Sequence, residues 1–314
     1  MADALLYTVE LVIGILLLVK GSDIFIDGAA GLAKRMGISE HVIGLTLVAF
    51  ATSLPELAVS SIASFNGAEG IAIGNVIGSN VANICLVLGI AAIIMQLKTT
   101  GETRRDSIFM VAVTLMLFAF IAIDGGVGRI GGLIFLGVYV VFIFHLYRTH
   151  SNNAGVNADE ILAEAGGTGA GYWKESLMIS FGAAAVVIGA HFLVESGVGI
   201  AGLIGISDLV IGLTMVALGT SLPELASSVA AALKGKHGIA IGNVVGSNII
   251  NILLVLGVAG MINPIRAGEE VYVMMSFLLF VSVAAAIFAS RKVGRREGVF
   301  LLALYALFVI ILFL

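Results

Sequence analysis

The sequence has few cysteines, prolines and charged residues. It contains 1 Cys and 3 Pro, and 11% of its 314 residues are charged, against about 25% in soluble domains. The single cysteine, Cys85, can form neither an internal disulfide nor a thiolate metal cluster. A net charge of -4 with no basic cluster does not indicate nucleic-acid binding. No Gly-x-x-x-x-Gly-Lys-Ser/Thr sequence is present, so no P-loop nucleotide site is expected.

Apolar residues, by contrast, are abundant and arranged in long blocks. They make up 60% of the chain, and the mean hydropathy is +1.13. Stretches such as 108–123 and 300–314 are apolar without alternation, which favours helices over the strands of a membrane barrel. About 20 helical residues cross a hydrocarbon core of about 30 Å. The sequence therefore predicts an all-α polytopic membrane protein.

The chain contains an internal duplication. The sequence Thr-Ser-Leu-Pro-Glu-Leu occurs at residues 52–57 and again at 220–225, a shift of 168 residues. The same shift aligns Gly-Asn-Val-x-Gly-Ser-Asn at residues 74–80 with its copy at 242–248. A repeat of this length indicates two copies of one structural unit.

Hydropathy divides each copy into five spans. The expected spans are residues 5–26, 42–66, 71–95, 107–124 and 130–147, then 175–195, 210–233, 238–262, 270–288 and 297–314. We therefore predict ten transmembrane helices in two five-helix repeats, residues 1–147 and 175–314, joined by a cytoplasmic linker at 148–174. An odd number of spans in each copy requires the two repeats to insert with opposite orientation.

The distribution of basic residues supports this inversion. One set of alternate loops holds nearly all of them: Lys34, Arg35, Lys98, Arg104, Arg105, Arg148, Lys174, Lys234, Lys236, Arg291, Lys292, Arg295 and Arg296. The other set holds only Arg129 and Arg266. Basic loops face the cytoplasm, so we expect a multi-pass protein of the cell membrane with both termini outside. Inverted repeats are typical of secondary transporters, which hold their substrate near the midplane.

The duplicated Thr-Ser-Leu-Pro-Glu-Leu motif carries the strongest signal of a functional site. Pro55 and Pro223 lack a backbone N–H and free a carbonyl one turn earlier, so helices 2 and 7 are expected to be discontinuous. Glu56 and Glu224 lie in apolar spans, where a carboxylate costs about 2.5–3.5 kcal/mol. No basic residue stands at the same depth. Two carboxylates without a basic partner favour protons or bound cations.

The neighbouring polar groups favour cations. Hydroxyls and amides surround the two carboxylates in the sequence, at Thr52, Ser53, Thr220, Ser221, Ser79, Asn83, Ser247 and Asn251. An all-oxygen set suits calcium, which takes six to eight oxygen ligands. Ser79 and Asn83 are four residues apart and share one helix face. Asn83 and Asn251 could instead bridge helices, Ser79 and Ser247 could bond to their own helix, and the two glutamates could form a buried protonated pair.

The doubled motifs resemble the alpha-repeats of the sodium/calcium exchangers, prokaryotic type, in the cation/calcium antiporter superfamily. The resemblance is carried by residues 42–56 with 74–83 and by 210–224 with 242–251. It implies four cation sites in a central cavity. It implies shared acidic ligands at Glu56 and Glu224, backbone ligands at Thr52, Thr220 and Ala217, and hydroxyl ligands at Ser53, Ser79, Ser221 and Ser247. Potassium-dependent members have Asp where this chain has Asn251, so the resemblance implies exchange without potassium.

We therefore expect an antiporter, not an enzyme, that exchanges sodium for calcium by alternating access at a shared midplane site. No cofactor is expected beside the transported ions, the surroundings are a lipid bilayer, and a monomer is the expected form. A proton/calcium or other cation/calcium antiporter remains the alternative. An intramembrane enzyme or a channel could also use paired acids, but neither needs two opposed copies of the scaffold.

Overall fold

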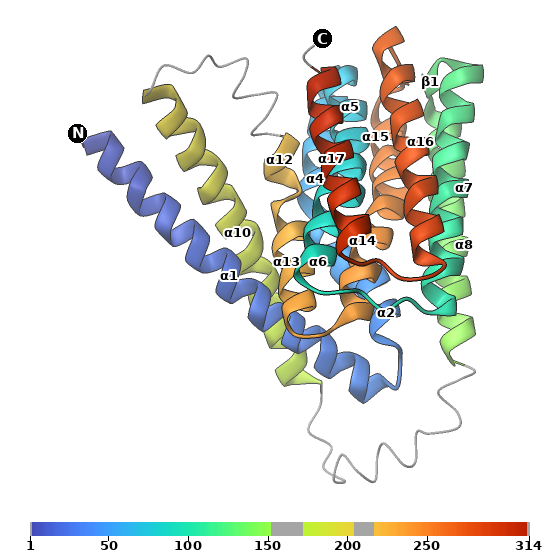
Figure 1. The fold of residues 1–314 in the computed structure, drawn as a ribbon. Coiled ribbons are helices and arrows are strands. Elements are labelled where there is room, and N and C mark those ends of the chain that lie inside the picture. Colours follow the sequence, from blue (N-terminus) through green and yellow to red (C-terminus); the bar gives the residue numbers. More distant parts are fainter. Residues whose placement is uncertain (1, 152–171, 204–216, 313–314) are drawn as a thin grey trace.

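The computed structural model describes residues 2–151, 172–203 and 217–312, which are almost entirely helical (Figure 1). The first half contains α1 (Ala2–Met36), α2 (Glu40–Ile43), α3 (Ala49–Thr52), α4 (Leu54–Phe65), α5 (Glu69–Ala82), α6 (Leu88–Ile94), α7 (Gly101–Asp124) and α8 (Arg129–Ser151). The second contains α10 (Trp173–Leu203), α12 (Ala217–Thr220), α13 (Leu222–Leu233), α14 (His237–Ile250), α15 (Leu256–Ile262), α16 (Glu269–Ala289) and α17 (Arg295–Leu312). Three π-helical turns, η1 (Gly44–Val48), η2 (Asn83–Val87) and η5 (Asn251–Val255), interrupt the long helices.

The sequence duplication reappears in the bounds of the elements. The helices α4, α5 and α6 have the same lengths as α13, α14 and α15, and each begins 168 residues before its counterpart. The π-helical turn η2 likewise corresponds to η5. Similar local sequences therefore produce elements with the same bounds in the repeat, including the irregular turns. The counterpart of η1 lies outside the described residues.

The first helices of the two halves, α1 and α10, lie side by side and run in opposite directions (Figure 1). Their contact is made by small residues. A Cβ atom on Gly21 would lie 2.8 Å from Ala185, and one on Gly28 would lie 2.8 Å from Met178. Without side chains at these glycines, the two backbones approach closely, as in many membrane helix pairs. The Arg35–Glu175 ion pair, at 2.8 Å, joins the same two helices at one end.

The buried helix α14 packs in the same way against the segment from α2 to α3. A Cβ on Gly242 would overlap the backbone of His41 and Leu45, and one on Gly246 would overlap the backbone of Leu45. The connections between helices add two short antiparallel pairings, β1 (Gly126–Val127) with β2 (Ile265–Arg266) and Leu97 with Val293. The centre of the molecule is therefore built from elements of both halves.

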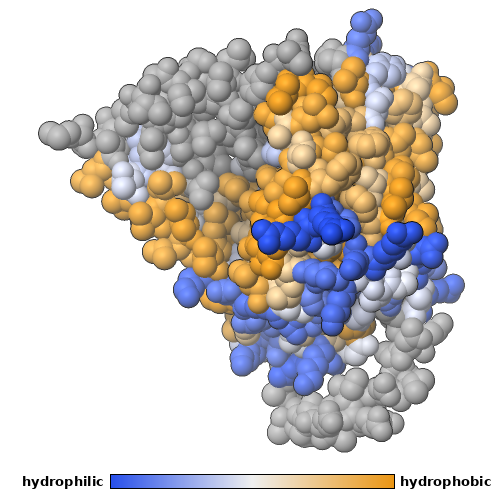
Figure 2. Space-filling model, viewed as in Figure 1, coloured by the Kyte–Doolittle hydropathy of each residue, from blue (hydrophilic) through white to orange (hydrophobic). Residues whose placement is uncertain are grey.

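The outer surface is that of a membrane protein. Large apolar side chains are widely exposed, including Ile123, Ile130 and Phe181 at 75–81%; such a surface suits lipid rather than water. Figure 2 shows hydrophilic residues gathered on the lower part of the face in view and hydrophobic residues above them. Six described helices are long and apolar enough to span a membrane, or seven if the pair bent by 46° at Ser53 counts as one. The expected total of ten spans stays a prediction.

The two ends of the predicted linker at 148–174 belong to helices. The helix α8 continues to Ser151 and α10 begins at Trp173, so both ends of the predicted linker are helical. No Gly or Pro interrupts residues 148–151, and Thr149 donates a hydrogen bond of 2.9 Å to the carbonyl of His145. A helix without a stop signal continues past the apolar segment. Residues 152–171, the rest of the predicted linker, lie outside the described part of the chain.

Candidate ion-binding site

Both Thr-Ser-Leu-Pro-Glu-Leu motifs interrupt a helix. The helix α3 ends at Thr52, Ser53 has φ -83° and ψ 6°, and α4 begins at Leu54 with Pro55 in its first turn. Ser221 has nearly the same conformation, with φ -88° and ψ 2°. Proline is tolerated in the first turn of a helix but not in its interior, so each motif starts a new helix. The predicted discontinuity is confirmed in both halves.

The new helix starts place two glutamates in the protein interior. Glu56 and Glu224 lie in the first turns of α4 and α13, and both are fully buried. The two carboxylates are close enough to repel each other electrostatically. None of the ion pairs in the described part of the chain includes either of them. Helix N-termini favour negative charge, but they do not neutralise two carboxylates.

Hydroxyls from both halves surround Glu224. Ser53 donates a hydrogen bond of 3.2 Å to Glu224 Oε1, and Ser247 donates one of 3.5 Å to the same atom. The Thr52 hydroxyl also interacts with this carboxylate. Because Ser53 and Thr52 belong to the first half and Ser247 to the second, the surroundings of Glu224 are shared between the repeats.

Glu56 has the corresponding neighbours, but its carboxylate accepts fewer hydrogen bonds than that of Glu224. The hydroxyls of Ser79 and Thr220 interact with its carboxylate, yet neither Oε atom of Glu56 has a partner at hydrogen-bond distance and geometry. The Ser221 hydroxyl, which corresponds to Ser53, also lacks a hydrogen-bond partner. The two half-sites therefore have the same composition but different hydrogen bonding.

The asparagines at the π-helical turns also differ between the halves. Asn251 donates a hydrogen bond of 3.1 Å to Asn80 Oδ1, whereas the Asn83 side chain is buried with neither polar atom bonded. Asn80 in turn donates to the Asn248 carbonyl at 3.2 Å. Asn83 and Asn251 are the first residues of η2 and η5, and π-helical turns frequently occur at functional sites. The helix-bridging alternative thus describes Asn251 in this structure and does not describe Asn83.

Several buried oxygens of the predicted site have no hydrogen-bond partner. They are Glu56 Oε1 and Oε2, Ser79 Oγ, Asn83 Oδ1, Ser221 Oγ, Glu224 Oε2 and Asn251 Oδ1. Buried polar atoms are nearly always hydrogen-bonded, so a group of exceptions requires an explanation. Oxygen atoms of carboxylates, hydroxyls and amides are the ligands that calcium and sodium prefer. The donor set therefore fits a hard cation.

Two amides that the sequence analysis did not include in the site contact it directly. Asn75 donates to Ser60 Oγ at 2.9 Å and to the Glu56 carbonyl at 3.4 Å. Asn243 makes the same two bonds, with the same lengths, to Ser228 Oγ and the Glu224 carbonyl. The sequence does contain the signal that identifies them, because each Asn lies 19 residues after its Glu in both copies.

The remaining predicted ligand, Ala217, lies at the edge of the described residues. Ala217 is the first described residue of α12, three residues before Thr220, so its backbone lies on the approach to the motif. Of the predicted side chains, those of Thr52, Ser53, Ser79, Thr220 and Ser247 interact with the two carboxylates.

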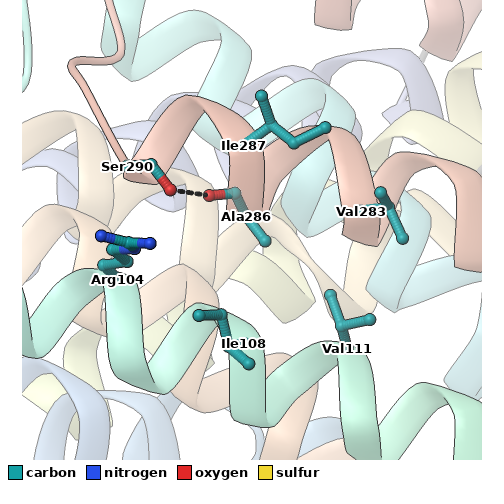
Figure 3. Close-up of a pocket in the computed structure, with 7 residues that line it drawn as sticks. All are labelled: Arg104, Ile108, Val111, Val283, Ala286, Ile287 and Ser290. Atoms are coloured by element: carbon teal, nitrogen blue, oxygen red, sulfur yellow. Dashed lines mark hydrogen bonds between the residues drawn. The ribbon is translucent and has the colours of Figure 1, made fainter.

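A groove between α7 and α16 is a poor alternative for a cation. Its lining, shown in Figure 3, consists of Arg104, Ile108, Val111, Val283, Ala286, Ile287 and Ser290. The walls are apolar, and the Ser290 hydroxyl is bonded to the Ala286 carbonyl at 3.1 Å. The only charged group in the lining, Arg104, would repel a cation. The groove contains none of the predicted site residues.

Comparisons with known proteins agree with this geometry. A sequence profile described as sodium/calcium exchanger protein matches residues 6–148 and 175–314. The sodium/calcium exchanger MaX1 of Methanosarcina acetivorans is 38% identical over 96% of this chain and 97% of its own length. The putative antiporter CaxA of Alkalimonas amylolytica is 37% identical over 95% of this chain and 96% of its own. The solved structure of the sodium-calcium exchanger NCX_Mj soaked with zero Na+ and Ca2+ superposes with a TM-score of 0.86 at 35% identity, covering 98% of this chain and 99% of that one.

Proposed function

Because the chain belongs to the sodium/calcium exchanger family, we propose that it is a secondary antiporter that exchanges sodium for calcium across the cell membrane. The family expected from the doubled motifs is thereby confirmed, and it is a family of ion exchangers, not of enzymes. The chain is accordingly a multi-pass integral membrane protein. We also propose the coupled ion, the transport cycle and the ligands of the site.

The observation that carries the proposal is the pair of buried carboxylates with unbonded oxygens around them. Glu56 and Glu224 are contributed by opposite repeats and share no basic partner among the described residues. One calcium ion neutralises the two negative charges, and several sodium ions do so too. Competition of the two ions for the same negative charge couples their movements without hydrolysis of a nucleotide.

The proposed cycle is alternating access within an inverted repeat of ten spans. The antiparallel packing of α1 against α10 supports the inversion, since these are the first helices of the two halves. The shared pocket opens in turn to either side of the membrane as one repeat rocks against the other. The basic loops lie in the cytoplasm and both termini lie outside. With Asn251 adding no charge to the pocket, potassium is not transported.

Calcium uptake into proteoliposomes tests the proposal. We expect uptake when the vesicles are loaded with sodium and diluted into sodium-free medium, little uptake without a gradient, and no added effect of potassium. Uptake driven by a pH gradient and indifferent to sodium would contradict sodium coupling. That result would favour the proton/calcium antiporter, in which the two buried carboxylates carry protons.

A further inference from the structure

We propose that Asn75 and Asn243 are positioning residues that join the two half-sites and thereby set the calcium affinity of the pocket. Each amide holds the glutamate of its own repeat and the threonine of the other repeat. The inference rests on the proposed function, because it assigns these residues a role in the same pocket. It adds a pair of side chains that are not ligands and that link the two repeats.

The links cross between the repeats with nearly equal geometry. Thr220 donates a hydrogen bond of 3.3 Å to Asn75 Oδ1, and Thr52 donates one of 3.2 Å to Asn243 Oδ1. The residues of each pair are 145 and 191 positions apart in the chain. All four side chains are at most 9% exposed. Because two equivalent contacts join residues so far apart in the chain, they depend on the assembly of the two repeats and not on packing within one helix.

The hydrogen bonds leave the amides little capacity to bind an ion. In each Asn, the two N–H groups bond to a serine hydroxyl and to the glutamate carbonyl, and Oδ1 accepts from the threonine. An asparagine side chain has two donors and one acceptor oxygen, so both donors and one of the two oxygen lone pairs are used. These residues therefore differ from Asn83, whose amide is buried and unbonded.

The links also affect whether the hydroxyl of each threonine directs its proton or its oxygen lone pairs to the neighbouring carboxylate. A hydroxyl has one proton, which Thr220 can donate either to Asn75 Oδ1, at 3.3 Å, or to the Glu56 carboxylate. When the proton is donated to Asn75, the oxygen lone pairs of Thr220 are available beside Glu56, where a cation between the two oxygens is stabilised. Thr52 has a similar relation to Asn243 and Glu224, and its proton can also be donated to the Ala49 carbonyl, at 3.3 Å compared with 3.2 Å for Asn243 Oδ1. Each Asn thus favours the cation-bound arrangement of the other repeat's threonine.

A crossed double-mutant cycle tests the inference in the full-length chain. The variants are Asn75→Ala, Thr220→Val and Thr52→Val, and the measurement is the calcium dissociation constant in detergent. Loss of one link should raise this constant about tenfold. Asn75→Ala with Thr220→Val should resemble one single variant, because both remove the same link. Asn75→Ala with Thr52→Val should give about the product of the two effects, because these belong to different links.

The expected result is non-additivity in the linked pair only; multiplicative effects in both pairs would overturn the inference. Melting temperatures without calcium identify variants that fail to fold. If Asn75→Ala does not fold, the equivalent cycle in the other half decides, with Asn243→Ala combined with Thr52→Val as the linked pair and with Thr220→Val as the unlinked pair. Non-additivity in the linked pair only supports the links, and multiplicative effects in both pairs overturn them. Calcium binding without sodium-driven uptake would refute the proposed exchange but not the link, whereas a wild-type chain that does not bind calcium would refute both.

Discussion

Ser53 donates a hydrogen bond of 3.2 Å to Glu224 across the boundary between the repeats. Its repeat counterpart, Ser221, is equally buried, but its hydroxyl has no hydrogen-bond partner, and neither has the Glu56 carboxylate. Two copies of one motif therefore occupy two different states in one structure. In the proposed alternating-access cycle, a pocket that opens to opposite sides of the membrane requires two such non-equivalent arrangements.

The first prediction follows from this asymmetry. Ser53→Ala removes a hydrogen bond to a buried carboxylate, which costs about 1.5–3 kcal/mol, whereas Ser221→Ala breaks no hydrogen bond in this structure. We expect Ser53→Ala to lower the melting temperature of the calcium-free and sodium-free protein more than Ser221→Ala does. Calorimetry in detergent measures both variants. Equal shifts would mean that the asymmetry is absent in solution.

The second prediction concerns the helix breaks. Pro55→Ala and Pro223→Ala restore an N–H group that can bond to the carbonyl four residues earlier and so extend one helix through the motif. We expect calcium binding to weaken at least tenfold while the melting temperature stays the same or rises, because Ala is the better helix former. Equilibrium calcium binding and thermal unfolding measure the two effects.

Pro264→Ala is the matched control for the proline variants. Pro264, the third proline of the chain, is exposed and precedes the short strand β2 outside the site, so its replacement should leave calcium binding unchanged. Wild-type calcium affinity in Pro55→Ala and Pro223→Ala would show that the breaks do not shape the pocket.

A third prediction concerns ligand stabilisation. An ion that binds only the folded state adds about 2.7 kcal/mol of stability at a concentration 100 times its dissociation constant. We expect calcium to raise the melting temperature of the wild type, magnesium to raise it much less, and Glu56→Gln to abolish the calcium effect. Magnesium is the useful comparison because it requires stricter octahedral geometry than calcium. Equal stabilisation by the two ions would indicate nonspecific binding.

The sequence was sufficient for the features that depend on local chemistry. The duplication, the helix breaks at Pro55 and Pro223 and the burial of Glu56 and Glu224 all appear in the structure as expected. A proline without an N–H and a carboxylate without a basic partner impose the same constraints in any fold. These features therefore follow from the residue types and their spacing.

Features that depend on tertiary packing were not predictable in the same way. The interaction of Asn75 with Thr220 joins residues 145 positions apart, and no local pattern specifies such a pair. The different hydrogen bonding of Asn83 and Asn251 also has no sequence signal, because the two residues are identical and align in the repeat. Two asparagines at equivalent positions of the repeat differ here because only Asn251 has a tertiary hydrogen-bond partner, Asn80.

The fourth prediction concerns orientation in the membrane. Lys98 and Asp124 are exposed and lie at opposite ends of the helix α7, Lys98 three residues before it begins and Asp124 as its last residue. In a Cys85→Ala background, we expect Asp124→Cys to react with an impermeant maleimide in intact cells and Lys98→Cys to react only after permeabilisation. The reverse pattern would place the basic loops outside. Cys85 is fully buried, so its removal takes away a background thiol with little structural effect.

We propose that one cation pocket is formed by a carboxylate from each repeat. Sodium-driven calcium uptake by proteoliposomes containing Glu56→Gln, Glu224→Gln or the control Glu269→Gln tests it most directly, since Glu269 is exposed at the start of α16. We predict that either Glu56→Gln or Glu224→Gln alone lowers uptake by about 100-fold or more, because each removes half of the charge that holds calcium. Glu269→Gln should retain wild-type uptake. Full exchange by both Glu56→Gln and Glu224→Gln would show that the two carboxylates do not form the cation pocket.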